Sequence, residues 1–251
     1  EAVSSMPDWL AQMLHNLILT GQCTDITLEL NDSLMTKVLD SGTVSTSPDF
    51  VLTGTCTTSF QTSGANRSNN IVVGASRLNN LIVMPGQTVS VSDTILPRTR
   101  ANGYKEAGVY VNGAHTTGLG GGVCQISSTV YNAVKNAGLT VVQRNPHSMP
   151  VNYLPKGLDA AIAAGSKDLK FRNDYTTPVV LYTDTSNKHL TVNVLVWNQE
   201  LAGRSFKLWA KQTGALSADT YFTTYQNGKE ISTQFVGTSR YNPYREAVND
   251  D

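Results

Sequence analysis

The sequence predicts an α+β fold made mostly of antiparallel β-strands, with one buried helix and a small C-terminal part that is entirely β. One basis is a glycine-rich stretch, residues 118–122, followed directly by apolar residues at helical spacing. Another is a series of short β-type runs bounded by turn residues. Composition agrees: only 15% of the 251 residues are charged, and Thr, Ser, Asn and Gly are abundant, which fits a β-rich protein outside the cytoplasm.

The buried helix is expected to begin at Cys124 and to end before Gly138. Ile126, Val130 and Val134 recur every four residues and define its apolar face. Gly138 follows as the left-handed residue that commonly closes a helix. Cys124 then lies in the first turn, where unpaired backbone N–H groups and the helix dipole favour negative charge. A thiol at that position ionises more readily, and the thiolate is its reactive form.

Cys124 is therefore a candidate nucleophile with a histidine as its base. His147 lies between Pro146 and Pro150, which stiffen the loop and hold the imidazole in one place. His115 is nearer to the cysteine in sequence and competes for the same role. Plainer interpretations also stay open, in which Cys124 is a buried structural cysteine and His147 is a turn histidine bonded to nearby backbone.

Asp159 is the candidate for a third catalytic residue, because a carboxylate can orient an imidazole. It could equally cap a short helix over the alanine-rich run 160–164. Gly121 and Gly122 have no side chains, so a substrate backbone could approach them closely. Glu106 could be a charge partner at the site or simply a solvated surface residue.

Elsewhere, local patterns predict further elements. Before Cys124 we expect a helix at 7–17, a strand at 25–30, a helix at 32–39, a strand at 50–60, a loop at 66–70, a helix at 71–81, strands on both sides of a Pro85-Gly86 turn, and a strand at 109–111. After the buried helix we expect strands at 139–143, 169–171, 179–182 and 190–194, and a hairpin around Asn227-Gly228.

The stretches GGGVCQISSTVYNAVKNAGL, RNPHSMPVNYLPKGLDA and DLKFRN resemble the VanW domain of bacterial cell-envelope proteins, named after vancomycin-resistance clusters. The resemblance runs from about Leu52 to about Trp197, and its GGGVCQ and PHS motifs are specific. Some proteins with this domain are understood to act as L,D-transpeptidases that use the motif cysteine as nucleophile. The resemblance therefore implies that Cys124 cross-links peptidoglycan, without a metal or cofactor.

The resemblance also implies substrate-binding residues. Tyr104 precedes the cysteine in the family pattern and is expected on the rim of the site. Arg172 stands beside the site motifs and could pair with a substrate carboxylate through two hydrogen bonds. The other substrate-binding candidates adjoin the two proposed catalytic residues: Gly121, Gly122, Gln125 and Ser148.

The expected reaction joins peptidoglycan stem peptides by acyl transfer. Cys124 would attack a peptide carbonyl and expel the terminal D-alanine, and an amine of a neighbouring stem would take the acyl group from the thioester. His147 would move the protons, and the backbone N–H of Cys124 or Gln125 would stabilise the oxyanion. The alternatives are a papain-like cell-wall cysteine amidase or peptidase and a non-catalytic peptidoglycan-binding module.

The charge is balanced, with 19 basic and 19 acidic residues, so nothing suggests that the chain binds nucleic acid. No apolar run is long enough to span a membrane, and no signal peptide is present. We expect a soluble fragment of a secreted or membrane-anchored protein that acts in the cell wall or at the outer face of the cytoplasmic membrane.

Three parts are expected along the chain. Residues 1–51 form a preamble, interpreted as the tail of a peptidoglycan-binding module; residues 52–197 form the catalytic domain; and residues 198–251 form a small C-terminal β module. No residue of the last part looks catalytic, so it is expected to be dispensable for the chemistry.

The cysteines Cys23, Cys56 and Cys124 permit one disulfide, Cys23–Cys56, or three free thiols. Their spacing gives no zinc signature.

Overall fold

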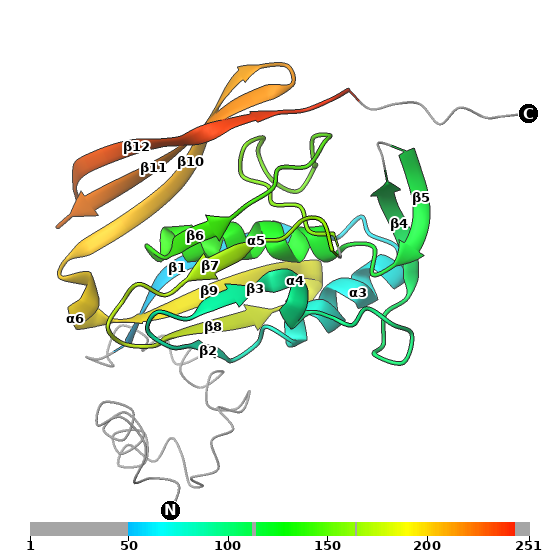
Figure 1. Cartoon of the computed structure of the whole chain (residues 1–251), viewed down its shortest axis with the longest axis horizontal. Coiled ribbons are helices and arrows are strands. Elements are labelled where there is room, and N and C mark those ends of the chain that lie inside the picture. Colours follow the sequence, from blue (N-terminus) through cyan, green and yellow to red (C-terminus); the bar gives the residue numbers. More distant parts are fainter. Residues whose placement is uncertain (1–49, 112–113, 164, 244–251) are drawn as a thin grey trace, which may run out of the picture. The chain divides into compact units, whose positions relative to one another are not determined.

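The computed structural model describes residues 50–111, 114–163 and 165–243 (Figure 1), and for residues 110, 111, 114 and 115 it describes the backbone alone. They fall in one compact unit of the chain. The expected elements before residue 50, and Cys23 with them, lie outside the described residues. Antiparallel strands predominate, which confirms the α+β fold class.

The largest sheet among the described residues has four strands in the order β1-β9-β8-β2, and all its strand pairs are antiparallel. Its strands are β1 (Phe50–Ser59), β9 (His189–Trp197), β8 (Val179–Asp184) and β2 (Leu81–Val83). Alternate residues of β9, from Leu190 to Val196, are fully buried, as expected of a strand with one face in the core. That face packs against helix α5 (Val123–Asn136) through β1 and β9.

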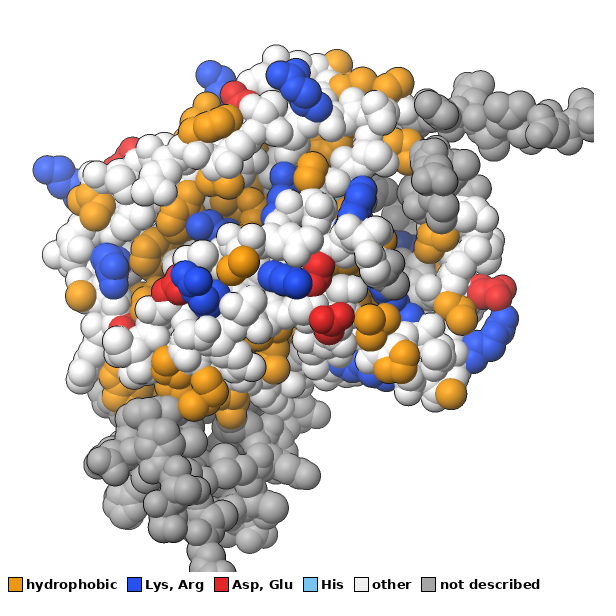
Figure 2. All heavy atoms as spheres, viewed as in Figure 1, with side chains coloured by type: hydrophobic (Ala, Val, Ile, Leu, Met, Phe, Trp, Pro, Cys, Tyr) orange, Lys and Arg blue, Asp and Glu red, His pale blue; other side chains and the backbone are white. Residues whose placement is uncertain are grey.

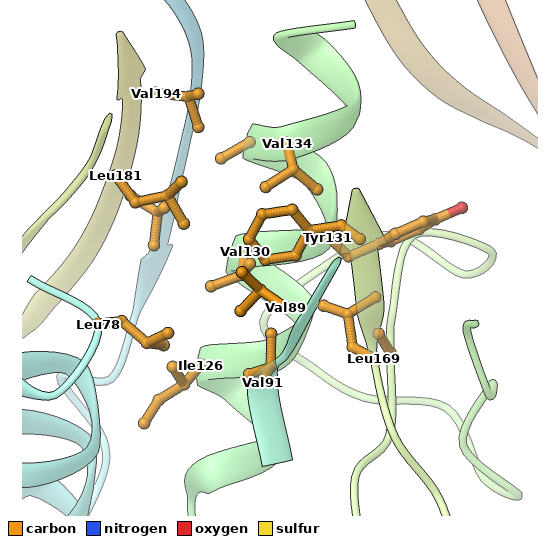
Figure 3. Close-up of a cluster of buried hydrophobic side chains, with 14 of the residues drawn as sticks. Leu78, Val89, Val91, Ile126, Val130, Tyr131, Val134, Leu169, Leu181 and Val194 are labelled. Atoms are coloured by element: carbon orange, nitrogen blue, oxygen red, sulfur yellow. The ribbon is translucent and has the colours of Figure 1, made fainter. Parts of the chain in front are cut away.

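Helix α5 has the apolar face that its sequence predicts, since Ile126, Val130 and Val134 are fully buried. Figure 3 shows them among Leu181 and Val194 of the four-stranded sheet, with Val89 of a second sheet close by. The second sheet has the order β3-β7-β6, with β3 (Thr88–Ser90), β7 (Lys170–Arg172) and β6 (Thr140–Gln143). Most of α5 is buried as a result, and Gly138 follows it with φ of +80°, as predicted.

Helix α3 (Ala65–Ser76) begins earlier than the sequence suggested, so the expected loop at 66–70 and the bounds of the helix at 71–81 are wrong. Three asparagines made this stretch resemble a loop. In the structure, Asn66, Asn69 and Asn70 donate to the backbone carbonyls of Glu106, Gly103 and Lys105, at 2.8–2.9 Å. These tertiary hydrogen bonds hold the first two turns of the helix against the next segment of the chain.

The remaining short elements connect the larger ones. They are α4 (Val91–Thr94), the hairpin strands β4 (Glu106–Val111) and β5 (Ala114–Leu119), the 3-10 turn η3 (Ser186–Lys188) and α6 (Asn198–Leu201). No helix among the described residues is long and apolar enough to cross a membrane. On the face shown in Figure 2, basic and acidic side chains are scattered and do not form a patch of one sign, in keeping with the balanced charge.

The C-terminal residues form the expected all-β part, a three-stranded antiparallel sheet in the order β10-β11-β12. Its strands are β10 (Arg204–Gly214), β11 (Ser217–Gln226) and β12 (Lys229–Arg240). The predicted hairpin turn is present, with φ of +50° at Asn227 and +77° at Gly228. One face of the sheet covers α5, because Leu208 is buried in the common core and its N–H donates to Asn136 Oδ1 at 2.8 Å.

Candidate active site

Cys124 is the second residue of α5, directly after the glycine-rich loop. Gly122 is the N-cap residue of the helix and has φ of +111°, a backbone conformation that other residues rarely adopt. The thiol of Cys124 is half-buried and donates to the carbonyl oxygen of Ile162 at 3.3 Å. The sulfur therefore lies at the start of the helix, facing the segment that carries Asp159.

Each glycine of the loop leaves room for another part of the chain. A Cβ at Gly120 would lie 2.9 Å from Cδ of Arg98, and a Cβ at Gly122 would lie 3.0 Å from Cγ of Arg67. A Cβ at Gly121 would lie 2.6 Å from the carbonyl oxygen of Gly108. The sequence suggested that Gly121 and Gly122 leave space for a substrate, whereas in the structure the protein itself occupies that space.

Gly121→Ala should therefore destabilise the protein. The added Cβ would meet backbone atoms of Ala107 and Gly108, at 2.8 and 2.6 Å, and backbone cannot rotate away as a side chain can. Overpacking of this kind costs about 1–3 kcal/mol, which thermal unfolding would detect. Gly64→Ala is the matched control, because nothing lies within 4 Å of its added atom. Equal melting temperatures for Gly121→Ala and the wild type would contradict this account of the loop.

The imidazole of His147 lies between Asp159 and Cys124. Its Nδ1 is 2.7 Å from Asp159 Oδ2, and the backbone N–H of His147 donates to the same oxygen at 2.7 Å. With Nδ1 engaged by the carboxylate, Nε2 is the ring nitrogen available to the thiol of Cys124, and the positive charge of His147 lowers the pKa of that thiol. The structure thus brings Cys124, His147 and Asp159 into one row.

Asp159 is fully buried, and its other oxygen is bonded as well. Oδ1 accepts from the hydroxyl of Tyr241 at 2.5 Å and from the guanidinium of Arg144 at 3.2 Å. Arg144 also donates to the carbonyl of Asp159 at 2.7 Å and lies over the ring of Tyr131. A buried carboxylate with this many donors is held ionised and in one orientation.

The polar face of α5 determines where Asp159 lies. Ser127 donates to the carbonyl of Ala160 at 2.5 Å, and Ser128 accepts from the N–H of the same residue at 2.9 Å. Asn132, further along the helix, donates to the carbonyl of Leu158 at 2.7 Å. Residues 158–162 run extended along α5 and form no helix. The alternative in which Asp159 caps a helix at 160–164 is therefore wrong for the described residues of that run.

The pKa values of the three groups follow from these contacts. Burial alone would raise the pKa of Asp159, but hydrogen bonds from His147 and Tyr241 and the charge of Arg144 lower it to about 2. Burial alone would lower the pKa of His147, but hydrogen bonds to Asp159 and Cys124 raise it to about 9. Burial opposes ionisation of Cys124 as well, yet the hydrogen bond and positive charge of His147 bring its pKa below the ordinary value. The arrangement favours a thiolate–imidazolium pair.

Cys124 should therefore react with iodoacetamide below the ordinary cysteine pKa of about 8.5. The raised pKa of His147 keeps it protonated up to about pH 9, so the ion pair should persist from the depressed pKa of Cys124 to that limit. Cys56 is a free thiol whose pKa burial raises to about 12, and it should stay unlabelled over the same range. Labelling rates against pH, read by mass spectrometry, test this. Faster labelling of Cys56, or a midpoint for Cys124 at 8.5 or above, would be evidence against the ion pair.

Several residues expected to bind substrate have other roles. Gln125 is buried, and its amide donates to Thr58 and to the carbonyl of Ser59, so it anchors the start of α5 to β1. Tyr104 is buried as well, with its hydroxyl on the carbonyl of Ile95, and does not form the rim of the site. Both side chains are buried in the protein and stabilise the elements around the site.

The charged candidates also differ from expectation. Arg172 is exposed on β7 and pairs with Asp174, and no described contact joins it to the three central residues. Glu106 pairs with Arg100 at 2.6 Å on the surface, which matches the solvated alternative. Ser148 remains exposed beside His147. The backbone of His115 pairs with β4, but its side chain is not among those described.

The C-terminal part, which was expected to be dispensable for the chemistry, contacts residues of the candidate site. The hydroxyl of Tyr241, besides donating to Asp159, accepts from the N–H of Gly157 at 2.7 Å. Ser239 accepts from Arg144 at 2.9 Å, and the N–H of Asn242 donates to the carbonyl of Ser148 at 2.7 Å. The end of β12 and the residues just after it therefore hold the loop that carries His147 and the loop that carries Asp159.

Sequence reasoning missed Arg67, Arg98, Arg144 and Tyr241. Arg144 could have been identified from the sequence, because it directly precedes the Asn-Pro-His motif. Tyr241 carries no such signal, since 82 residues separate it from Asp159. Tyr153 also lies close to Cys124. In the structure its hydroxyl lies 3.4 Å from that of Ser128, and burial and the charge of Cys124 raise its pKa.

Comparisons with known proteins identify the family that the chain resembles. The model of the family described as "VanW like protein" matches residues 66–195, which include all three central residues. The chain is 42% identical over 128 residues to Uncharacterized protein YoaR of Bacillus subtilis (strain 168), and 35% identical over 114 residues to Vancomycin B-type resistance protein VanW of Enterococcus faecalis (strain ATCC 700802 / V583). The matches cover 51% and 43% of this chain, and the chain spans 42% of the length of each relative. No solved structure matches.

Proposed function

Because the chain belongs to the VanW-like family, we propose that it is a cysteine-dependent L,D-transpeptidase that cross-links peptidoglycan stem peptides. The observation that supports this most is the row of Cys124, His147 and Asp159, in which contacts and charges favour a thiolate beside a protonated imidazole. Peptidoglycan as substrate places the protein in the cell envelope, secreted or anchored through a part of the protein beyond the described residues.

In the proposed first half-reaction, the thiolate of Cys124 attacks the carbonyl before the terminal D-alanine of a tetrapeptide stem. The backbone N–H of Gln125 already donates to the carbonyl of Gly122 at 3.0 Å, so the N–H of Cys124 is the better donor to the oxyanion. His147 gives its Nε2 proton to the leaving nitrogen as the C–N bond breaks. D-alanine departs as a neutral amine product, and the acyl group remains on sulfur as a thioester.

In the second half-reaction, an amine of a neighbouring stem attacks the thioester. The neutral imidazole of His147 takes a proton from that amine as the new amide bond forms and the thiolate leaves. Asp159 stays ionised throughout and stabilises the imidazolium that forms again. The cycle ends with the same thiolate–imidazolium pair with which it began.

The test is mass spectrometry of tetrapeptide stem fragments incubated with the protein. We expect cross-linked dimer and free D-alanine, and incorporation of a small D-amino acid when it is added in excess. If tripeptide alone accumulates and the added amino acid is never incorporated, the protein is a hydrolase of the amidase or peptidase type.

Cys124→Ala distinguishes an enzyme from a binding module. The variant of an enzyme should lose turnover and keep its affinity for the stem fragments. If the wild type binds the fragments without changing them, and Cys124→Ala binds equally well, the catalytic proposal is wrong.

A further inference from the structure

Two arginines lie close to Cys124, and each packs against a glycine of the glycine-rich loop. The side chain of Arg98 packs along Gly120, and that of Arg67 packs against Gly122. Both are half-buried and both interact electrostatically with the thiol. Each arginine uses the space that a missing glycine side chain leaves, so the loop brings two positive charges to the nucleophile.

Neither arginine has an acidic partner among the described residues. Arg67 donates to neutral oxygens, Ser63 Oγ at 2.5 Å and Gln125 Oε1 at 2.9 Å. The guanidinium of Arg98 has no hydrogen-bond acceptor or ion pair in the part of the chain that the structure describes. This differs from Arg100 and Arg144, which pair with Glu106 and Asp159.

The positive charge at the site therefore exceeds the negative charge. Asp159, the one carboxylate at the site among the described residues, is already shared by His147, Arg144 and Tyr241. Partly buried charges are usually paired, because removing them from water is costly. The N-terminus of α5 adds partial positive charge at the same place. An anion bound beside Cys124 would accept charge-assisted hydrogen bonds from Arg98.

We propose that Arg98, together with Arg67, forms a carboxylate-binding site beside Cys124. The identity of the ligand rests on the proposed function: it is the free carboxylate of the terminal residue that the reaction releases from the donor stem. In such a substrate that carboxylate is attached to the same Cα as the scissile nitrogen, so it lies next to the carbonyl that the thiolate attacks. The site selects stems that end one residue after the scissile bond.

Two alkylating reagents test the site without any peptidoglycan reaction. Iodoacetate carries a carboxylate and iodoacetamide does not, so the ratio of their rates at Cys124 reports carboxylate binding beside the sulfur. We expect the ratio in the wild type to exceed that of a free cysteine amide. Arg98→Gln should lower the ratio on the order of tenfold, the effect of one charge-assisted hydrogen bond. Any change in the ionisation of Cys124 affects both reagents alike and cancels in the ratio.

The variants of Arg98 separate the charge of its side chain from its packing on the loop. Glutamine keeps the Cβ, Cγ and Cδ atoms that pack on Gly120, so Arg98→Gln removes the charge with little loss of packing. Arg98→Lys should restore part of the ratio. Arg100→Gln, two residues away and exposed, should leave it unchanged. A ratio that equals that of the free thiol in the wild type, or that stays the same in Arg98→Gln, overturns the proposal.

A second comparison tests the identity of the ligand. Tetrapeptide stems with a free C-terminal carboxylate should be used in preference to their C-terminal amides, through a lower KM, and Arg98→Gln should lose that preference. If no stem is turned over while iodoacetate is still favoured, the carboxylate site stands and the transpeptidase proposal fails. If stems are cross-linked equally with acid or amide ends, the carboxylate site fails and the transpeptidase proposal stands.

Discussion

His147→Ala should lower the rate of thioester formation at Cys124 on the order of 10²–10⁴-fold, the usual loss when a general acid–base group is removed. The imidazole supplies both the hydrogen bond and the positive charge that lower the pKa of Cys124, while burial of the thiol acts in the opposite direction. Without His147, burial prevails and the thiol stays protonated at neutral pH. The proton for the leaving amine is lost as well.

The measurement is the accumulation of acyl-enzyme with a tetrapeptide stem, followed by intact-protein mass spectrometry, together with iodoacetamide labelling at pH 7. Labelling depends only on the thiolate and does not require the proposed reaction. His115→Ala is the control, since His115 was the competing candidate. A larger loss in His115→Ala than in His147→Ala, with both proteins folded, would show that the base has been misassigned.

Removal of the C-terminal sheet, by ending the chain after Ala202, should reduce the reactivity of Cys124 as strongly as His147→Ala. Leu208 leaves the common core, and Asp159 loses Tyr241 while Arg144 loses Ser239. The buried carboxylate then has fewer donors, and the loop of His147 loses the contact between Ser148 and Asn242. Iodoacetamide labelling at pH 7 and thermal unfolding measure both consequences. A shortened chain that stays folded and labels at the wild-type rate would show that the sheet is dispensable.

Tyr241→Phe separates the loss of the hydrogen bond from the loss of the fold. The hydroxyl donates to Asp159 and helps to hold the pKa of that carboxyl near 2, well below its ordinary value. Since the folded pKa is depressed, this stabilisation is present above the unfolded pKa of about 3.9 and is lost as the pH falls through the folded value. In Tyr241→Phe the folded pKa should rise. The acid limit of Cys124 labelling should then move to higher pH in a protein that still folds but melts at a lower temperature, because part of this stabilisation is lost. An unchanged pH profile would show that Tyr241 only fills space.

The sequence alone was sufficient for the features that depend on short stretches of chain. Helix α5 follows from apolar residues every four positions and a glycine that ends them, and Cys124 is placed by that helix. The hairpin at Asn227-Gly228 follows from the backbone preferences of two residues. Cys124, His147 and Asp159 could be selected as candidates because their motifs are local, although their contact could only be hypothesised.

Tertiary structure decided what the neighbouring groups are and what they do. Tyr241 reaches Asp159 only because the chain at the end of β12 folds over the loop that carries it. Arg67 and Arg98 come close to Cys124 because two glycines of one loop leave room for their side chains. Gln125 and Tyr104 resemble site residues in sequence, but hydrogen bonds to distant backbone bury them behind the site. The reason is that the free energy of a charge or a hydrogen bond depends on which partners surround it. Those partners come from segments whose separation in the chain carries no information about their distance in the fold.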